Sequence, residues 1–407
     1  MGDALNLRHA RKFLSEDLKL GPLLYLTSIF WINFIARVIL SPLMPAIEKD
    51  LGLSHTDAGT LFLFISIGYF VGIFGSGFVA SKVTYRKTII SSAVIVAIAM
   101  IGIGCSPGIR TIRLGLLTMG IGSGLYLPSG IATITTLVET RHWGKALAIH
   151  ELAPNLGFIS APLICVALVS SISWRGVLIV IGVVSLLNAL TFTFLGSGGR
   201  FAGEPPGRQS ITTLMRVPSF WIMAVVFSLG VGSTLGIYTM LPLFLVFEHG
   251  YERNLANTFL SLSRLPGIAV VFLAGWARDR FGSRRTLMLV FSIGGAITVL
   301  LGLATGNMLL VLIFIQPWVA GCFFPAGFAA LSSIGPTSVR SIAVSLTLPF
   351  STLVGGGAFP TLIGFMGDRG SFGSGIAIVG GCILCGALLS WLLKIEGEET
   401  GQSDKKP

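Results

Sequence analysis

Two arginines lie inside long apolar runs of the sequence, where a permanent positive charge is costly. Arg37 lies in the first run, and Arg264 lies in NTFLSLSRLPGIAVVFLAG, residues 257–275. An arginine at the centre of a membrane helix costs about 2.5–3.5 kcal/mol. A planar guanidinium binds a carboxylate or phosphate through two parallel hydrogen bonds. Both residues are therefore candidates for binding a small anion. For Arg264 the alternatives are an ion pair with Glu151, or packing and capping; for Arg37 the alternative is snorkelling to the interface.

A second candidate site is the pair His150 and Glu151, the only adjacent titratable residues within an apolar run. Imidazole and carboxylate groups can both change protonation in a dry environment or beside an arginine. We therefore expect this pair to bind and release protons. The alternative is a solvated Glu151 that stays ionised, because it lies only about two helical turns from Lys145.

Seven more polar or aromatic residues lie within the runs, where their polar tips would need partners. Each is a candidate to line a binding site. Tyr126 ranks first, because it lies two residues before Pro128, which we expect to kink its helix. The seven are Asn33, Tyr69, Tyr126, Asn155, Tyr238, Gln316 and Trp318.

The elements that carry these residues are predicted to be membrane helices. Of 407 residues, 53% are hydrophobic and 11% are charged, which leaves too little polar surface for a water-soluble protein. Apolar runs of about 20 residues, long enough to cross a bilayer, recur along the chain. The first is too long for a signal peptide, so no cleavage is expected. We expect twelve spans, at 20–47, 56–80, 88–106, 111–138, 145–170, 174–197, 219–247, 254–277, 286–305, 308–333, 341–366 and 373–394.

The net charge of +11 follows the expected sides of the membrane. With a cytoplasmic N-terminus, six of the 28 Lys and Arg residues fall in outer loops, two fall inside spans and 20 fall on the inner side. Such a bias is typical of cytoplasmic loops. We therefore expect a multi-pass protein of the cell membrane with both termini in the cytoplasm. The charge indicates orientation and not nucleic-acid binding.

No pattern indicates catalysis, a metal or a cofactor. The sequence has no Walker motif, no Ser-His-Asp set and no metal-ligand spacing. Cys382 and Cys385 form a C-x-x-C in the last span, without His or acidic neighbours, and are interpreted as packing residues. The runs GIGSG and GVGSTLG lack the strand that precedes a nucleotide-binding loop. We interpret them, and the G-x-x-x-G of Gly68 and Gly72, as helix-packing faces.

The chain divides into two similar halves. The pattern G-x-x-x-P-x-G occurs in GLYLPSG at 124–130 and again 197 residues later in GCFFPAG at 321–327. Pro42 and Pro242 match at an offset of 200, and Pro162 and Pro360 match at an offset of 198. Such near-constant offsets indicate an internal duplication. Between the halves, GSGGRFAGEPPGRQS reads as a linker. The predicted parts are a tail at 1–19, a six-helix bundle at 20–197, a linker at 198–218, a second six-helix bundle at 219–394 and a tail at 395–407.

The loop after the second span of each half carries a further match. GWARDRFGSRR, residues 275–285, reads G-x-x-x-D-R-x-G-x-R-R. Its copy GFVASKVTYRK, residues 77–87, has Ser81 for the acid and Thr84 for the glycine. With the twelve spans and the duplication, this loop makes the whole chain resemble the major facilitator superfamily.

The resemblance implies an all-α membrane protein with two pseudo-symmetric six-helix bundles around a central cavity, which rock to give alternating access. Spans 1, 4, 7 and 10 of this superfamily line the cavity and spans 2, 5, 8 and 11 flank it. This places Arg37 on a lining helix and Arg264 on a flanking helix.

The resemblance also predicts a cytoplasmic latch in the second-half loop. Asp279 is expected to interact with the positive end of the helix that starts near Lys145, holding the inner side shut. The alternative is that the loop only fixes topology through its basic residues. The latch residues are Gly275, Asp279, Arg280, Gly282 and Lys145.

Together these features predict a secondary active transporter, with a proton-coupled carrier of a small organic anion as the leading mechanism. We expect a monomer without cofactor, whose partners are the substrate, the proton and the bilayer. One alternative is a proton-linked drug exporter, although HELAPNLGFISAPL lacks the Gly-Pro pair usual in that group. An alternative of another class is a receptor that does not transport, but the C-terminal tail is too short for a signalling domain.

Overall fold

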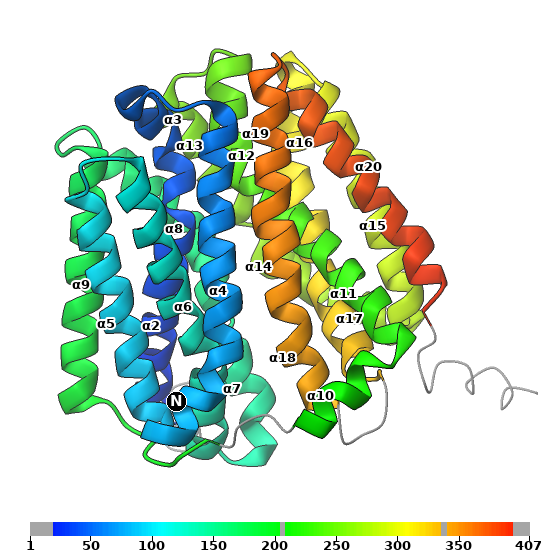
Figure 1. The fold of residues 1–407 in the computed structure, drawn as a ribbon. Coiled ribbons are helices and arrows are strands. Elements are labelled where there is room, and N and C mark those ends of the chain that lie inside the picture. Colours follow the sequence, from blue (N-terminus) through cyan, green and yellow to red (C-terminus); the bar gives the residue numbers. More distant parts are fainter. Residues whose placement is uncertain (1–18, 204–207, 335–339, 394–407) are drawn as a thin grey trace, which may run out of the picture.

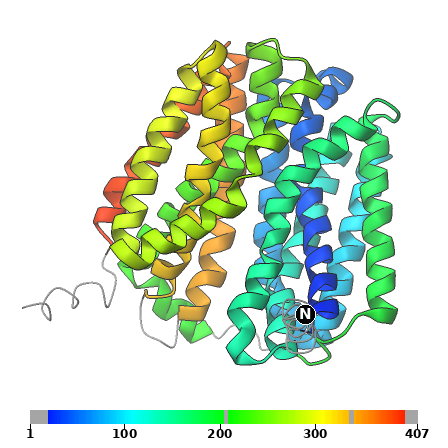
Figure 2. The same cartoon turned by 180° about the vertical axis from the view of Figure 1, so that it is seen from behind.

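The structure is a computed structural model and describes residues 19–203, 208–334 and 340–393. Within these ranges the chain is helical and contains no strand. The helices form two bundles that lie side by side (Figures 1 and 2). Eleven helical segments in the described part are long and apolar enough to cross a membrane. The predicted fold class, two bundles of membrane helices, is confirmed.

The first bundle contains spans 1 to 6. Four of them are single helices: α4 (His55–Val83), α5 (Tyr85–Gly104), α6 (Ile109–Leu137) and α9 (Trp174–Leu195). Span 1 consists of α2 (Leu20–Val38) and α3 (Leu40–Leu51), and span 5 consists of η1 (Thr140–His142), α7 (Trp143–His150) and α8 (Leu152–Leu168).

The second bundle follows the short helix α10 (Arg208–Met215). Span 7 consists of α11 (Pro218–Val231), η2 (Gly232–Gly236), α12 (Ile237–Leu243) and η3 (Phe244–Glu248). Spans 9 and 10 are α15 (Ser283–Leu303) and the pair α16 (Gly306–Gly321) and α17 (Phe323–Leu331). Spans 11 and 12 are α18 (Arg340–Ser351), η5 (Thr352–Ala358) and α19 (Phe359–Asp368), then α20 (Phe372–Trp391).

Span 8 differs from the prediction of one helix at 254–277. It consists of α13 (Arg253–Arg264) and α14 (Gly267–Phe281), with a break at Leu265 and Pro266. Proline has no amide hydrogen to donate, so the backbone hydrogen bonds of the helix are interrupted there, although Leu265 and Pro266 keep helical dihedral angles. The break therefore follows Arg264 directly, and it explains why span 8 is not among the eleven long helices.

Glycines allow close helix contacts, as predicted. A Cβ at Gly68 or Gly72 of α4 would overlap backbone atoms of α6, and a Cβ at Gly120 or Gly124 of α6 would overlap backbone atoms of α4. The G-x-x-x-G of span 2 and the GIGSG of span 4 are thus the two sides of one contact.

A second glycine contact joins spans 7 and 11, where both helices adopt π-helical turns. A Cβ at Gly236 in η2 would overlap the carbonyl oxygen of Gly355 in η5. A π turn shifts the backbone hydrogen bonds by one residue, and such turns are frequent at functional sites. The run GVGSTLG is therefore a packing face, as predicted, and also a widened turn.

The two loops of the repeated motif have the same structural role in both halves. Arg86 donates to the carbonyls of Gly196 and Phe192 at 2.6 and 3.0 Å, at the end of α9. Arg284 likewise donates to the carbonyl of Trp391, the last residue of α20. A cation at a helix C-terminus binds the free carbonyls there and opposes the helix dipole. This equivalence supports the duplication read from the sequence.

The halves contact each other at the end of the molecule opposite Lys19, the first described residue. Ser41 of α3 donates to the carbonyl of Tyr238 at 3.0 Å. Asn257 of α13 donates to the carbonyl of Pro42 at 3.2 Å. In Figure 1, α3, α12, α13 and α19 gather at this upper end, while α2 begins at the lower end. We call the upper end the closed end.

Candidate functional site

Arg37 lies in the last turn of α2, buried between the two halves. Its guanidinium carbon is 3.7 Å from the centre of the Tyr69 ring and 5.6 Å from that of Phe34. The side chain is 9% exposed, and its Nε has no hydrogen-bond partner. Cation–π contacts with two rings partly replace the water that burial removes. They do not give Nε a hydrogen-bond partner.

Arg264 is the last residue of α13 and is partly buried. One of its terminal nitrogens donates to the carbonyl of Thr234 at 3.1 Å. Its guanidinium carbon lies 4.5 Å from the centre of the Phe158 ring and 5.0 Å from that of Tyr238. Thr234 belongs to η2, so the π turn supplies a carbonyl that this arginine can reach.

Both guanidiniums lie against one aromatic cluster, which consists of Phe34, Phe158 and Tyr238. The rings of Phe34 and Phe158 are 4.9 Å apart and nearly perpendicular, and those of Phe158 and Tyr238 are 4.7 Å apart. Within the described residues, none of the ion pairs includes Arg37 or Arg264. The structure thus brings the two predicted arginines to one apolar seam between the halves, without a protein carboxylate.

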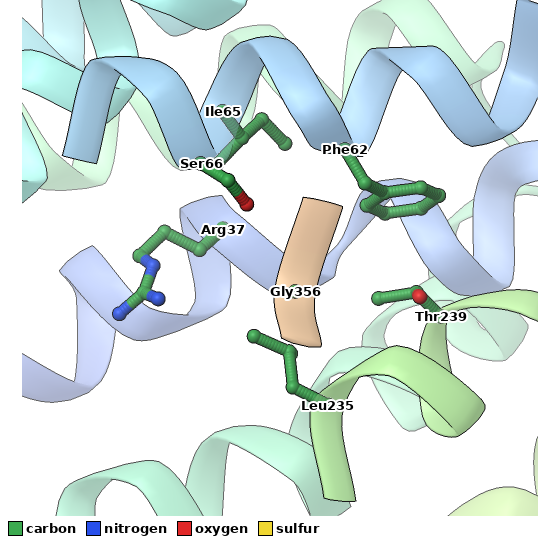
Figure 3. A pocket seen from close by; sticks show the side chains of 7 residues that line it. All are labelled: Arg37, Phe62, Ile65, Ser66, Leu235, Thr239 and Gly356. Atoms are coloured by element: carbon green, nitrogen blue, oxygen red, sulfur yellow. The ribbon is translucent and has the colours of Figure 1, made fainter. Parts of the chain in front are cut away.

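A small pocket lies beside Arg37 at this seam (Figure 3). The first half contributes Arg37, Phe62, Ile65 and Ser66, and the second contributes Leu235, Thr239 and Gly356. Its volume is about 10 Å³, which is room for about one water molecule. An organic anion can therefore reach this pocket only after the helices around it move apart.

Two other predicted residues support the C-terminal side of the site. Gln316 donates to the carbonyl of Ser233 in η2 at 2.8 Å, and Trp318 donates to the carbonyl of Ser263 in α13 at 2.8 Å. Gln316 and Arg264 therefore bind consecutive carbonyls of the same π turn. The amide oxygen of Gln316 is buried and has no partner. In this conformation both side chains position the backbone around Arg264.

The remaining predicted residues lie in the first half. Asn33 is buried and donates to Ser92 Oγ at 3.3 Å, while its amide oxygen has no partner. Asn155 donates to the carbonyl of Glu151 at 3.4 Å. Tyr126 has no exposed surface.

Tyr126, His150 and Glu151 form one hydrogen-bonded chain inside the first bundle. Tyr126 Oη lies 3.1 Å from His150 Nε2, and His150 Nδ1 lies 3.4 Å from Glu151 Oε1. Phe30 stacks on the imidazole at 4.6 Å between ring centres. His150 is fully buried, whereas the Glu151 side chain is 52% exposed. The chain therefore runs from the surface of the bundle into its interior.

The geometry of this chain defines a place for one proton. Tyr126 donates its only hydrogen to the carbonyl of Leu26 at 2.5 Å, so its oxygen accepts from His150 Nε2, which must carry a hydrogen. A hydrogen bond between Nδ1 and Glu151 then needs one more proton, on either the imidazole or the carboxyl group. In this conformation Glu151 is paired with His150 and not with Arg264.

The predicted latch residues lie at the end opposite the closed end. Asp279 pairs with its neighbour Arg278 at 2.8 Å and is 71% exposed. The Arg280 guanidinium lies over Trp276, and Lys145 is exposed. Gly275 has open space around it, and Gly282 has a φ of 83°.

Sequence reasoning missed the residues that join the two arginines. Phe34 and Phe158 have no polar group, and aromatic residues are common in every span, so neither spacing nor type distinguished them. Thr234 lies in a glycine-rich run that was interpreted only as packing. The available signal was that Thr234 is a polar residue within this run. A π turn there leaves backbone carbonyls that side chains can bind.

Comparison with known proteins identifies the family. A model of the Major Facilitator Superfamily matches residues 26–276 and 254–407. The cis,cis-muconate transport protein of Acinetobacter baylyi is 23% identical over 395 residues, covering 90% of this chain and 92% of that protein. A probable sulfoacetate transporter of Cupriavidus necator is 24% identical over 281 residues, which cover 63% of this chain and 64% of the relative.

Solved structures agree in fold. A bacterial homologue of the human lysosomal transporter Spinster, in an inward-facing and unoccupied conformation, gives a TM-score of 0.75 at 17% identity, covering 93% of this chain and 96% of that one. A D-xylose-proton symporter gives a TM-score of 0.72 at 16% identity, covering 92% of this chain and 98% of that one. With the family match over nearly the whole sequence, the chain belongs to the major facilitator superfamily of membrane transporters.

Proposed function

We propose that this protein is a proton-coupled carrier of a small organic anion, held between Arg37 and Arg264. The observation that carries the proposal is the pair of guanidiniums on one aromatic cluster between the halves, without a carboxylate partner in the described part of the chain. A buried charge without a counter-ion is costly, and a bound anion would supply one. Each half provides one arginine, so a bound anion would also draw the halves together.

The names of several relatives support an anionic substrate. Besides the muconate and sulfoacetate proteins, they include a 4-hydroxybenzoate transporter of Pseudomonas putida and a probable L-galactonate transporter of Escherichia coli. These names describe carboxylates and a sulfonate. We place this chain with them because its two guanidiniums, which have no carboxylate partner among the described residues, suit such groups.

In the proposed orientation, the N-terminus is cytoplasmic and the closed end faces outward. The conformation is then inward-facing. Arg264, which is partly exposed, would meet the anion first, and Arg37 would complete the site as its pocket widens. The exposed Asp279 agrees with this state, because a latch that shuts the inner side is released when that side opens.

The chain of Tyr126, His150 and Glu151 is the proposed proton site. Its counterparts in the second half support this role, since Phe323 lies 197 residues after Tyr126 and Leu348 lies 198 residues after His150. Tyr126 packs against Gly130, and Phe323 packs against Gly327 in the same way. The fold therefore accepts apolar residues at these positions. The polar chain of the first half is therefore not needed for packing. We assign it to proton binding, which its geometry suits.

A ligand screen tests the substrate class. We expect carboxylates to raise the thermal stability of the purified protein in a concentration-dependent way, because a ligand that binds the folded state stabilises it. A multidrug efflux protein of Bacillus subtilis is 24% identical over 366 residues, which makes drug export the second candidate. Stabilisation by cationic drugs alone would favour that candidate and reject the anion. Binding of carboxylates without any flux in proteoliposomes would favour a receptor.

A further inference from the structure

His55 begins α4 in the first half and contacts the second half at the closed end. Its ring centre lies 4.6 Å from that of Phe372 and 5.1 Å from that of Phe247. Its backbone N–H donates to Asp368 Oδ1 at 2.8 Å, and the N–H of Thr56 donates to Oδ2 at 2.9 Å. Asp368 is the last residue of α19, so a carboxylate of one half caps a helix of the other.

The imidazole of His55 also binds a buried acid of its own half. Nδ1 lies 3.0 and 3.1 Å from the two carboxylate oxygens of Glu48, which is 3% exposed at its side chain. When Glu48 is ionised, its carboxylate only accepts hydrogen bonds, so Nδ1 then carries a hydrogen. No hydrogen bond to Nε2 is formed within the described residues, and the His55 side chain is 23% exposed. Nε2 is therefore available for a second proton.

Charges of both halves surround this imidazole. Glu48 faces it from the first half, and Asp368 of the second half interacts with it electrostatically. The ring also lines an open vestibule of about 920 Å³ at the closed end. Two acids there have partners, since Asp50 pairs with Arg175 and Glu252 accepts from the N–H of Leu255 at 3.0 Å. The other charged residues that line the vestibule are Lys49 and Arg253.

We propose that His55 is a proton-binding site, separate from the Tyr126–His150–Glu151 chain, which favours closure of the two halves when it is charged. With a neutral ring, the carboxylates of Glu48 and Asp368 approach each other from opposite halves without a cation between them. A proton on Nε2 places an imidazolium between the two acids. It also turns the contacts with Phe247 and Phe372 into cation–π contacts.

Whether protonation of His55 favours or opposes closure depends on the contacts that His55 gains when this end closes. Glu48 and His55 belong to the same half and stay neighbours when the end opens. Asp368, Phe247 and Phe372 belong to the other half, so His55 loses its contacts with them when this end opens. The charged ring gains more from these three partners than the neutral ring does, so acid favours the closed end. The positive charges of Lys49 and Arg253, which line the same vestibule, oppose protonation.

The test measures the distance across the closed end as a function of pH. Spin labels at Arg110→Cys and Asn307→Cys report on the two halves, because both residues are exposed at this end. The five native cysteines are first replaced by alanine. In nanodiscs, we expect the ratio of closed to open populations to rise roughly threefold to tenfold from about pH 8 to about pH 5.5, the range in which imidazole titrates. His55→Gln should abolish this rise, and Asp368→Asn should lower the closed population at every pH.

A second histidine at this end gives a matched control. His249 makes an edge-on contact with Phe244 within its own half. His249→Gln should keep the pH response of the distance. A pH response that survives in His55→Gln, or that disappears equally in His249→Gln, would overturn the proposal. The readout is a distance and not flux, so a failure of the anion hypothesis leaves this test intact.

Discussion

The guanidinium of Arg37 lies 3.7 Å from the centre of the Tyr69 ring, with its Nε buried and without a partner. The ring face compensates part of the cost of the charge, while Nε keeps no hydrogen-bond partner. Arg37 is thus held in place without being neutralised. A residue that serves only packing would gain more from an ion pair or from carbonyl oxygens, as Arg86 does at the end of α9.

The first prediction concerns the ring beneath Arg37. Tyr69→Phe keeps the π face and should change anion affinity less than about threefold, whereas Tyr69→Leu removes it and should weaken binding by about tenfold. Isothermal titration calorimetry of a carboxylate identified in the ligand screen measures both. Equal effects of the two substitutions would show that the ring face does not hold Arg37.

Tyr126→Phe should uncouple transport from protons. The variant copies Phe323 of the second half, so it should fold, but it leaves His150 Nε2 without its acceptor. We expect uptake driven by a pH gradient to fall at least tenfold, while exchange of labelled for unlabelled substrate continues. The expected loss corresponds to about 1.4 kcal/mol, within the cost of leaving a buried donor unsatisfied. Gradient-driven uptake at the normal level would remove this chain from the mechanism.

Thr84→Gly should stabilise the protein. Thr84 has a φ of 116°, and its counterpart Gly282 has a φ of 83°. A β-branched residue in this region is strained by about 1–3 kcal/mol, and glycine relieves the strain at an entropic cost of about 0.5–1 kcal/mol. We expect a net gain of about 1 kcal/mol, seen as a higher thermal unfolding midpoint. The reciprocal change Gly282→Thr should lower that midpoint, and an opposite result for either variant contradicts the account.

Asp279→Asn should bias the transporter further towards the conformation described above. The acid is exposed here and would contribute only in the outward-open state, when it reaches the helix that starts near Lys145. We expect a thiol probe applied from outside to react less with a cysteine at a position that is buried at the closed end here, such as Ser41→Cys. Ser81→Asp restores the acid in the first-half copy and should have the opposite effect. Unchanged labelling in both variants would leave the loop with a role in topology alone.

The fold could be predicted well from the sequence, because apolar runs, basic loops and repeat offsets are long-range patterns that tolerate local error. Span 8 was the exception, and Pro266 carried the signal for its break. The site was predicted less completely. Arg37 and Arg264 stood out because charges are rare in these spans. The aromatic cluster between them depends on how α2, α8 and α12 meet, which no local pattern encodes.

For Tyr126, the sequence singled out the residue but did not indicate its contacts. Its position in the repeated motif marked it as unusual, and the choice of a substrate-lining role rested on its helix alone. The structure joins it to His150, which lies 24 residues later. The comparison with Phe323 could have been made from the sequence, since the offset of the repeat pairs a phenol with a plain phenyl ring.

Uptake of a labelled carboxylate into proteoliposomes, compared between the unaltered protein and Arg264→Gln, tests the central claim most directly. The matched control is Arg175→Gln, which alters a partly exposed arginine paired with Asp50 at the closed end. The account predicts that Arg264→Gln reduces uptake at least about tenfold, because a charge-assisted hydrogen bond contributes about 1.5–3 kcal/mol, and that Arg175→Gln transports normally. Undiminished uptake by a folded Arg264→Gln protein would contradict it.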